Sequence, residues 1–267
     1  MHLHCIAKEV YYPESKEELV HLIKQLSIHK KDYRILGACS NVILPSKLSV
    51  PVIFLTSFNK ECSINNDVVM VGASVRIQHL IREAQKCGLG GIEYLFSVPC
   101  TVGGATVMNA GRGNGKQSIG VYIKEVQCLN MDTLQYETLT KEECMYGFRN
   151  SIFLRGNRIV LSITLNLDQI ESQLIEERIN ERKQYALEKL DDRRPSSGSI
   201  FKMANGRILR SLKGFRIGGS EWSKKTNNWI SNRSNARNWQ IRMLIYIACF
   251  LHRITFQPYH LEVEIWK

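Results

Sequence analysis

The chain lacks any apolar run long enough to span a bilayer. Its 267 residues are 44% hydrophobic and 23% charged, as in globular proteins, but no stretch approaches the roughly 20 apolar residues of a membrane-spanning helix. The N-terminus, MHLHCIAKEVYYPES, also lacks the cationic flank and apolar stretch of a signal peptide. We therefore expect a soluble, cytoplasmic protein with no membrane partner, large enough for one α/β unit or two modest domains.

The cysteine pattern of a zinc site is also missing. The eight cysteines form no CxxC pair, and no HxxxH accompanies them. Most lie in apolar or glycine-rich surroundings, where a free cysteine behaves as a small hydrophobic residue. We expect reduced thiols and no bound metal.

Acidic residues are fewer than basic ones, with 25 Asp and Glu against 36 Lys and Arg. The formal net charge is +11 and the isoelectric point is about 9.3, which suits either nucleic acid or a phosphorylated small molecule. Lys and Arg are spread along the chain, with only a loose concentration between residues 193 and 216. Arms that bind nucleic acid are usually denser, so no nucleic-acid partner is expected.

Periodicity and capping signals predict a chain of mixed helices and strands. Ser15 and Glu18 form a capping box before a helix over residues 16–29, and Gly88 is expected to end a second helix over 77–87. The stretch YRILG predicts a strand that opens through ACSN into another. A charged helix over 171–190 marks a boundary near residue 168, and helices over 208–213 and 236–253 precede a terminal strand in HLEVEIW.

A glycine-rich segment in mid-chain suggests close approach of backbone to a ligand. It contains no GxxxxGK[ST] and does not follow the GxGxxG arrangement of dinucleotide folds. In SVPCTVGGATVMNAG, Pro99 fixes the chain and Thr101 offers a hydroxyl. Exposed amides of Gly103, Gly104 and Gly111 could reach a pyrophosphate. Taken alone, the segment could also be a glycine-rich loop with no ligand.

The chain resembles the UDP-N-acetylenolpyruvoylglucosamine reductases, enzymes of peptidoglycan synthesis. LGACSN resembles that family's LGxGSN, and SVPCTVGGATVMNAG resembles GIPGTVGGAxxMNAG. FRNSIF, GSIFK, LKGFRIGG and LEVEI resemble YRxSxF, GSxFK, LKGxxxGG and the closing LexEV. The resemblance is collinear over residues 12–267. The length and the absence of an inserted tyrosine loop favour the shorter subclass.

The resemblance implies an α+β protein with the FAD-binding fold of the vanillyl-alcohol-oxidase (PCMH) type. It places an FAD-binding domain at 1–168, in two α+β subdomains split near residue 56. A substrate-binding α+β domain at 169–258 and a terminal strand at 259–267 follow. The FAD-binding residues implied are Gly37, Ser40, Asn41, Pro99, Thr101, Gly103, Gly104, Asn109, Ala110 and Gly111.

The resemblance implies a flavoprotein oxidoreductase. Members of the family use NADPH to reduce bound FAD, and the reduced FAD then reduces the enolpyruvyl ether of a UDP-sugar to give UDP-N-acetylmuramate. Ser199 matches the serine that protonates the substrate carbon, and Arg149 and Glu264 match the pair that stabilises the intermediate. Lys202 and Lys225 are expected substrate contacts. The implied roles are cell wall biogenesis, cell shape, the cell cycle and cell division. The chain is expected to act as a monomer.

The chemistry agrees with those roles. An enol ether accepts hydride poorly until charge developing on the carboxylate side is countered, and fixed cations there contribute several kcal/mol. Arg149 can hold a carboxylate by two parallel hydrogen bonds. Glu264 has to be protonated or to share a proton, and we expect it to be buried. Ser199 needs a polar relay because its hydroxyl is a weak acid.

Some positions depart from the family pattern. Ala38, Cys39 and Cys100 carry Cβ where the family has glycine, and Ser97 begins its GIPG motif. A positive φ at such a position costs of order 1 kcal/mol. A flavin-lining strand that precedes residue 12 in the family is expected to be missing. Two alternatives remain. The chain could be a scaffold with weakened flavin binding, no turnover and a binding or regulatory role, or another flavoprotein, which would need a histidine in the glycine-rich segment.

Overall fold

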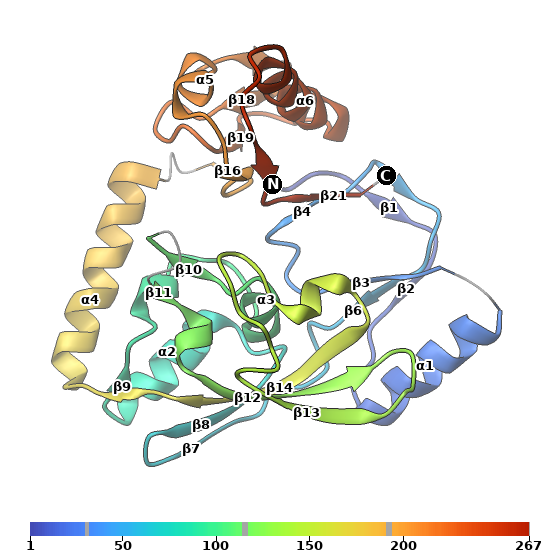
Figure 1. The fold of residues 1–267 in the computed structure, drawn as a ribbon, viewed down its shortest axis with the longest axis vertical. Coiled ribbons are helices and arrows are strands. Elements are labelled where there is room, and N and C mark those ends of the chain that lie inside the picture. The colour runs from blue at the N-terminus through green and yellow to red at the C-terminus, as the bar shows by residue number, and fades with distance from the viewer. Residues whose placement is uncertain (30–31, 114–116, 191–193, 267) are drawn as a thin grey trace. The chain divides into compact units, whose positions relative to one another are not determined.

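The computed structural model describes residues 1–29, 32–113, 117–190 and 194–266. The chain folds into two compact units, each built from separate stretches of sequence (Figure 1). Within these described ranges, unit 1 comprises the residues that fall in 1–8, 39–49 and 184–267, and unit 2 comprises those that fall in 9–38 and 50–183. The predicted domain limits at 168 and 258 stay a prediction.

The first layer of unit 2 is a small parallel sheet with one helix. Strands β2 (Val10–Tyr11), β6 (Val52–Phe54) and β3 (Arg34–Leu36) pair in that order. Helix α1 (Lys16–Ile28) begins at Ser15, whose hydroxyl accepts a hydrogen bond from the Glu18 amide, so the predicted start is confirmed. The buried side of α1 packs with apolar residues of β6, β12 and β14.

The main sheet of unit 2 is antiparallel and holds the glycine-rich segment against its helices. Its order is β13 (Tyr136–Thr140), β12 (Ile123–Asn130), β14 (Arg158–Asn166), β8 (Val68–Gly72) and β7 (Cys62–Asn65). Helices α2 (Ile77–Lys86), α3 (Val102–Val107) and α4 (Ser172–Tyr185) share its core. Gly88, with φ of +68°, follows α2 as predicted.

Short elements complete unit 2. Strand pairs join β9 (Leu89–Gly90) with β15 (Asp168–Gln169), and β10 (Gly111–Arg112) with β11 (Gln117–Ser118). Single 3₁₀ turns occur at η1 (Glu93–Leu95), η2 (Ile119–Val121) and η3 (Ile152–Arg155).

Unit 1 collects the two ends of the chain with the short segment 39–49. Its strands pair as β1 (Ile6–Ala7) with β5 (Lys47–Leu48), β21 (Glu264–Ile265) with β4 (Val42–Ile43), and β16 (Phe201–Met203) with β20 (His260–Leu261). Strands β17 (Arg216–Ile217), β18 (Ser220–Trp222) and β19 (Ile230–Asn232) form an antiparallel meander. Helices α5 (Gly206–Ser211) and α6 (Asn238–Ile254) share a hydrophobic core with it. Trp222 is at the centre of its core.

The structure confirms the predicted α+β character and most helix positions. The charged helix predicted over 171–190 ends as α4 at Tyr185, and one π-helical segment, η4 (Ala186–Leu190), follows. Two short strands, β1 and β2, precede residue 12. All eight cysteines lie in the described part of the chain, and no disulfide joins them. Among the described residues, none of the helices combines the length and the apolar character that crossing a membrane requires.

Candidate active site

Ser199 lies in a loop of unit 1 that is anchored on both sides. Before it, the Ser197 hydroxyl accepts a hydrogen bond from the Ile230 amide at 3.0 Å. After it, the side chain of Asn228 contacts both backbone groups of Phe201, accepting from the amide at 3.0 Å and donating to the carbonyl at 2.7 Å. Gly198, with φ of +66°, turns the chain between the anchors. The loop is therefore held by β19 and by Asn228 rather than by Ser199 itself.

The terminal segment of the chain lies directly against this loop. The amide of Glu262 donates to the Ile200 carbonyl at 2.8 Å, and the Glu264 amide donates to the Asn41 carbonyl at 3.0 Å. The Asn41 side chain in turn donates to the Glu262 carbonyl at 2.9 Å. Three segments far apart in sequence thus bring Asn41 and Glu264 beside the Ser199 loop. Ser40, which precedes Asn41, is exposed at this turn.

The burial expected of Glu264 is wrong. Its side chain is exposed, and Oε1 accepts a hydrogen bond from Trp266 Nε1 at 2.8 Å. The reason is that β21 pairs through its backbone with β4 while the preceding residue, Val263, fills the core. Register, which sends neighbouring side chains to opposite faces, therefore exposes Glu264.

The two predicted lysines have different surroundings. Lys202 is exposed on β16, next to the buried Phe201. Lys225 is also exposed, and its Nζ donates to the Leu187 carbonyl at 2.5 Å. Its amide donates to the Ser223 hydroxyl at 3.1 Å. Lys202 therefore comes from the strand that follows Ser199, whereas Lys225 belongs to the turn between β18 and β19.

Arg149 occupies a turn of unit 2 that Asn109 holds in place. The Asn109 side chain donates to the Gly147 carbonyl at 2.8 Å and accepts from the Gly120 amide at 3.0 Å. The Ser151 hydroxyl adds a bond to the Val107 carbonyl at 2.6 Å. Arg149 and Asn109 both have left-handed backbone, with φ of +49° and +44°. The turn is thus fixed to the end of the glycine-rich segment.

The guanidinium of Arg149 is directed back onto that same segment. Its Nη2 donates to the Gly111 carbonyl at 2.7 Å and Nη1 to the Asn109 carbonyl at 3.5 Å. The Phe148 ring lies 5.9 Å from the guanidinium carbon. The structure therefore brings together three of the predicted residues, Arg149, Asn109 and Gly111, in unit 2. Ser199 and Glu264 are in unit 1.

A further group meets at Thr101, in the glycine-rich segment. Its hydroxyl caps α3 by accepting from the Gly104 amide at 3.2 Å. A Cβ at Gly37 would lie 3.1 Å from the same hydroxyl, and a Cβ at Gly104 would lie 3.4 Å from it. Gly37, Thr101 and Gly104 therefore come together where the chain leaves β3 and enters α3.

The expectation of exposed amides throughout this segment is wrong. Gly103 is buried and its amide donates to the Ala73 carbonyl at 2.8 Å, because α3 packs on the chain after β8. A Cβ there would lie 2.8 Å from Ala73 Cβ. Gly111 is paired with Ser118, and its missing Cβ makes room for the Gln117 carbonyl. Pro99 is exposed and Ala110 is buried.

The substituted glycine positions behave differently from one another. Cys39 has left-handed backbone, with φ of +55°, whereas Ala38 and Cys100 are not among the residues with positive φ. Cys100 is buried, and burial raises the pKa of its thiol to about 12. The predicted backbone cost therefore applies to Cys39 alone.

Two residues near the site were missed by the sequence. Asn228 clamps the strand after Ser199, but an Asn between a turn and a strand carries no distinctive signal. Tyr94 in η1 has a buried hydroxyl without a hydrogen-bond partner in the described part of the chain. Burial raises the pKa of Tyr94, and the neighbouring Arg149 charge opposes that rise.

These features fit a bound FAD in unit 2. The buried hydroxyl of Tyr94 lacks a partner within the described ranges, and such a group normally has one. Gly37 and Gly104 both place backbone without a side chain next to the Thr101 hydroxyl. A hydroxyl beside backbone without side chains is what a long anionic cofactor requires.

Comparisons with known proteins agree with this geometry. A family model described as an FAD binding domain matches residues 7–137. The UDP-N-acetylenolpyruvoylglucosamine reductase of Clostridium botulinum is 32% identical over 84% of this chain and 75% of its own length. That of Francisella tularensis is 31% identical over 97% of this chain and 92% of its own.

A solved structure extends the likeness to the whole fold. The crystal structure of UDP-N-acetylenolpyruvylglucosamine reductase from Thermus caldophilus matches with a TM-score of 0.79 and 27% identity, covering 97% of this chain and 92% of that one. The predicted FAD-binding α+β fold is thereby confirmed. The chain belongs to the UDP-N-acetylenolpyruvoylglucosamine reductase family.

Proposed function

We propose that this chain reduces UDP-N-acetylenolpyruvoylglucosamine to UDP-N-acetylmuramate with NADPH as co-substrate and FAD as cofactor. The proposal is supported by family membership over nearly the whole chain. The observation that carries it is the meeting of Asn41, Glu264 and the Ser199 loop through the Ile200 and Asn41 carbonyls. FAD, when bound, takes up hydride from NADPH and supplies it to the substrate.

Ser199 is the proposed proton donor. Its hydroxyl makes no hydrogen bond among the described residues, so it is not committed to the fold, and its loop is held by Ser197 and Asn228. A group held within hydrogen-bond reach of a carbon that gains negative charge can pass its proton there as the charge develops. Preorganisation of the loop would lower the entropic cost of that step.

Arg149 is the proposed partner of the substrate carboxylate. The Asn109 and Gly111 carbonyls orient its guanidinium, and a planar guanidinium binds carboxylate by parallel hydrogen bonds. Holding that carboxylate stabilises the charge that spreads onto it during the reaction. The residue is anchored by its left-handed turn, so it needs little reorganisation when substrate binds.

Glu264 is proposed to complete the site from the terminal strand. Trp266 Nε1 fixes the position of Oε1, and Oε2 is proposed to interact with the substrate. Lys202, from the strand after Ser199, and Lys225 are proposed to contact the charged part of the UDP-sugar. Each lysine is exposed, and a flexible ammonium group suits a pyrophosphate.

The proposed cofactor contacts are the residues that the sequence names. Gly37, Thr101 and Gly104 meet in unit 2, and Asn109, Ala110 and Gly111 follow α3. Gly103 supports the packing of α3 through Ala73, so its contribution to FAD binding is proposed to be indirect. Pro99, Ser40 and Asn41 stay proposed contacts.

The proposed cellular role is the supply of a peptidoglycan precursor, and through it cell wall biogenesis, cell shape, the cell cycle and cell division. A cytoplasmic, monomeric enzyme is the form we propose. The alternative of a scaffold without turnover draws no support from the comparisons.

The test is a turnover assay of the purified chain. We expect a yellow protein whose flavin is bleached by NADPH and whose NADPH consumption depends on the UDP-sugar. A colourless protein that also fails to bind added FAD would rule out the reductase and favour the scaffold. A yellow protein that oxidises NADPH but never consumes the UDP-sugar would keep the flavoprotein and reject this substrate.

A further inference from the structure

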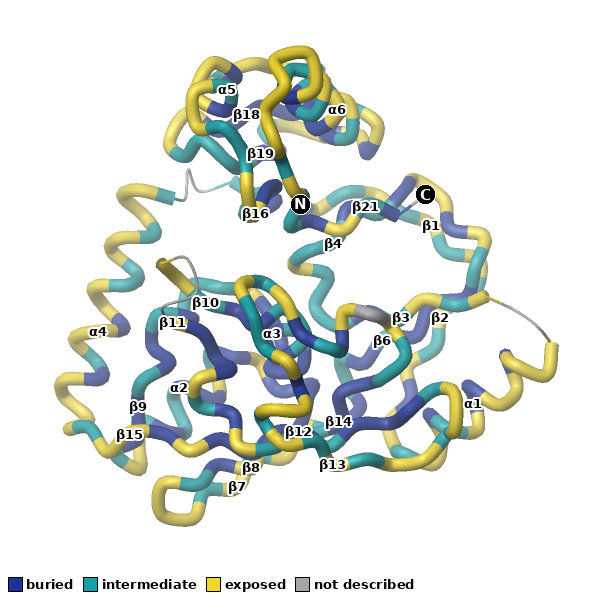
Figure 2. Tube along the Cα trace, in the orientation of Figure 1, coloured by how far each residue is buried: buried dark blue, intermediate teal, exposed yellow. Residues whose placement is uncertain are grey.

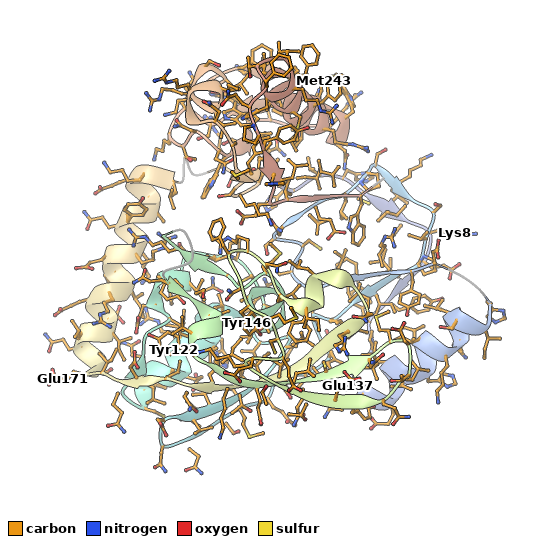
Figure 3. All side chains as sticks on the ribbon, in the orientation of Figure 1. Lys8, Tyr122, Glu137, Tyr146, Glu171 and Met243 are labelled. Carbon is orange, nitrogen blue, oxygen red and sulfur yellow. The ribbon has the colours of Figure 1, made fainter. Side chains whose placement is uncertain are left out.

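Helix α6 presents a continuous apolar stripe to solvent, in addition to its buried side. The stripe consists of residues at helical spacing on one face together with the residue just past the helix end, and its members are 44% to 93% exposed: Trp239, Met243, Tyr246, Phe250, Ile254 and Phe256. The rings of Tyr246 and Phe250 stack with centroids 6.5 Å apart. Figure 3 labels Met243 within this group.

The stripe is not explained by the core of unit 1. The opposite face of α6 supplies the buried residues Ile241, Leu244, Ile245 and Ala248, and Figure 2 shows exposed and buried positions alternating along the helix. A surface helix normally carries polar residues on its outer face. An exposed patch of large apolar side chains usually marks an interaction site.

The same part of the chain carries all of the protein's net charge. Residues 194–261 hold twelve Lys or Arg and a single acidic residue, Glu221, a net of +11 that equals the formal net charge of the whole chain. Glu221 is buried and forms an ion pair with Arg233, so it adds no negative charge to the surface. Arg242 and Arg253 are on α6 itself, and the helix contains no acidic residue.

We propose that the α6 stripe binds the surface of a membrane rich in anionic lipids. A helix whose aromatic and aliphatic face is flanked by cations lies in the plane of the lipid headgroups, with its apolar side chains at the boundary of the acyl chains. Trp239 and Tyr246 are residue types that prefer this interface. The contact is interfacial, since no helix among the described residues could span a membrane.

Charge and side-chain chemistry favour anionic lipid over a second copy of the chain or nucleic acid as the partner of the α6 stripe. A second copy of the chain would bring two strongly basic surfaces together, and like charges oppose that contact. Nucleic acid would satisfy the cations, but Met243 and Ile254 in the same stripe offer no ring for a base to stack upon. Anionic lipid satisfies both the positive charge and the aliphatic side chains.

The experiment is flotation of the full chain, loaded with FAD, with two kinds of vesicle. One kind is phosphatidylcholine alone, and the other contains equal parts of phosphatidylcholine and phosphatidylglycerol. The stripe variant is Tyr246→Ser with Phe250→Ser. Its matched control, Met70→Ser with Tyr136→Ser, removes two side chains of similar exposure from β8 and β13, outside the basic stretch. Bound flavin and circular dichroism verify that each variant is folded.

We expect binding to the anionic vesicles only, weakened by salt and retained by the control. The stripe variant should lower the partition coefficient at least about tenfold. Arg242→Gln with Arg253→Gln should lower it about 25-fold, since each cation near an anionic surface contributes about fivefold.

Failure of the wild type to bind either vesicle would overturn the proposal, as would equal binding by the stripe variant. Sedimentation in which the stripe variant abolishes a dimer, without vesicle binding, would assign the stripe to a second copy. Loss of RNA binding by the stripe variant, again without vesicle binding, would assign it to nucleic acid. None of these outcomes depends on the proposed reductase activity.

Discussion

Removal of the Asn109 side chain tests how the Arg149 turn is held. Asn109 is buried and joins the Gly147 carbonyl to the Gly120 amide. In Asn109→Ala and Asn109→Gly the buried Gly120 amide loses this partner, whereas the Gly147 carbonyl keeps the hydrogen bond from the Asn150 amide at 3.2 Å. A buried group left without a hydrogen bond costs about 1–3 kcal/mol, so each variant should lose about 1–3 kcal/mol in the free energy of unfolding.

Comparing the two variants separates the cost of losing the Asn109 side chain from the cost of holding a residue with a Cβ at positive φ. Asn109 has φ of +44°, which glycine adopts freely and alanine does not. Asn109→Ala should therefore be about 1 kcal/mol less stable than Asn109→Gly. Urea unfolding, followed by circular dichroism at constant FAD concentration, gives both differences.

The same variants should weaken catalysis through Arg149. A looser turn no longer places the guanidinium against the Asn109 and Gly111 carbonyls, so kcat/KM for the UDP-sugar should fall about tenfold, equivalent to about 1.4 kcal/mol. Flavin absorbance shows whether cofactor is retained. If both Asn109 variants unfold at the wild-type urea concentration and keep the wild-type kcat/KM, Asn109 does not hold the Arg149 turn.

Three further predictions concern single side chains. Cys39→Gly should stabilise the chain by about 0.5–1 kcal/mol because φ at this position is +55°, whereas Cys100→Gly, at a buried position without positive φ, should destabilise it by about 1–2 kcal/mol; equal signs in thermal unfolding would refute the backbone argument. Hydrogen bonds from Arg82 and then Gln85 hold the pKa of Glu176 at about 2. Because this folded-state pKa lies below the unfolded value of about 4.3, the ion pair stabilises the fold above that value and the benefit disappears as pH falls toward 2. Glu176→Gln should cost less than about 1 kcal/mol at neutral pH, since the side chains of Arg82 and Glu176 are 35% and 38% exposed and the solvent weakens their attraction. A destabilisation by Glu176→Gln that is as large near pH 2 as at pH 7, measured by urea unfolding, would contradict this linkage. Arg149→Lys should lower kcat/KM at least tenfold with flavin content unchanged, because a lysine cannot make the two contacts of a planar guanidinium; wild-type kinetics would remove the residue from the proposed role.

Much of the fold could be predicted from local signals. The capping box at Ser15 and the glycine after α2 mark helix ends through backbone chemistry that does not depend on tertiary context. The strands of two residues in unit 1 have no such signal, because their pairing is made between segments as distant as 42–43 and 264–265. Only the folded chain shows that these segments are neighbours.

The candidate site was predictable as a set of residues but not as a set of environments. Ordered motifs predict roles for Arg149, Ser199 and Glu264, and those roles stay a prediction. The exposure of Glu264 follows from strand register, which one sequence does not display. Gly103 shows the same limit. The density of glycine around it predicts contact with a ligand, whereas in the structure Gly103 packs closely against Ala73. The apolar content of α6 was evident, but its division into a buried face and an exposed stripe depends on what packs against it.

The central claim is that the Ser199 hydroxyl delivers the proton to a substrate reduced by this chain's FAD. Rapid mixing under anaerobic conditions measures the two half-reactions separately in the wild type and in Ser199→Ala. We predict that NADPH bleaches the flavin of both proteins at equal rates, and that the UDP-sugar restores flavin colour quickly in the wild type but at least about a hundredfold more slowly in Ser199→Ala. Equal recovery of colour in the two proteins would contradict the account.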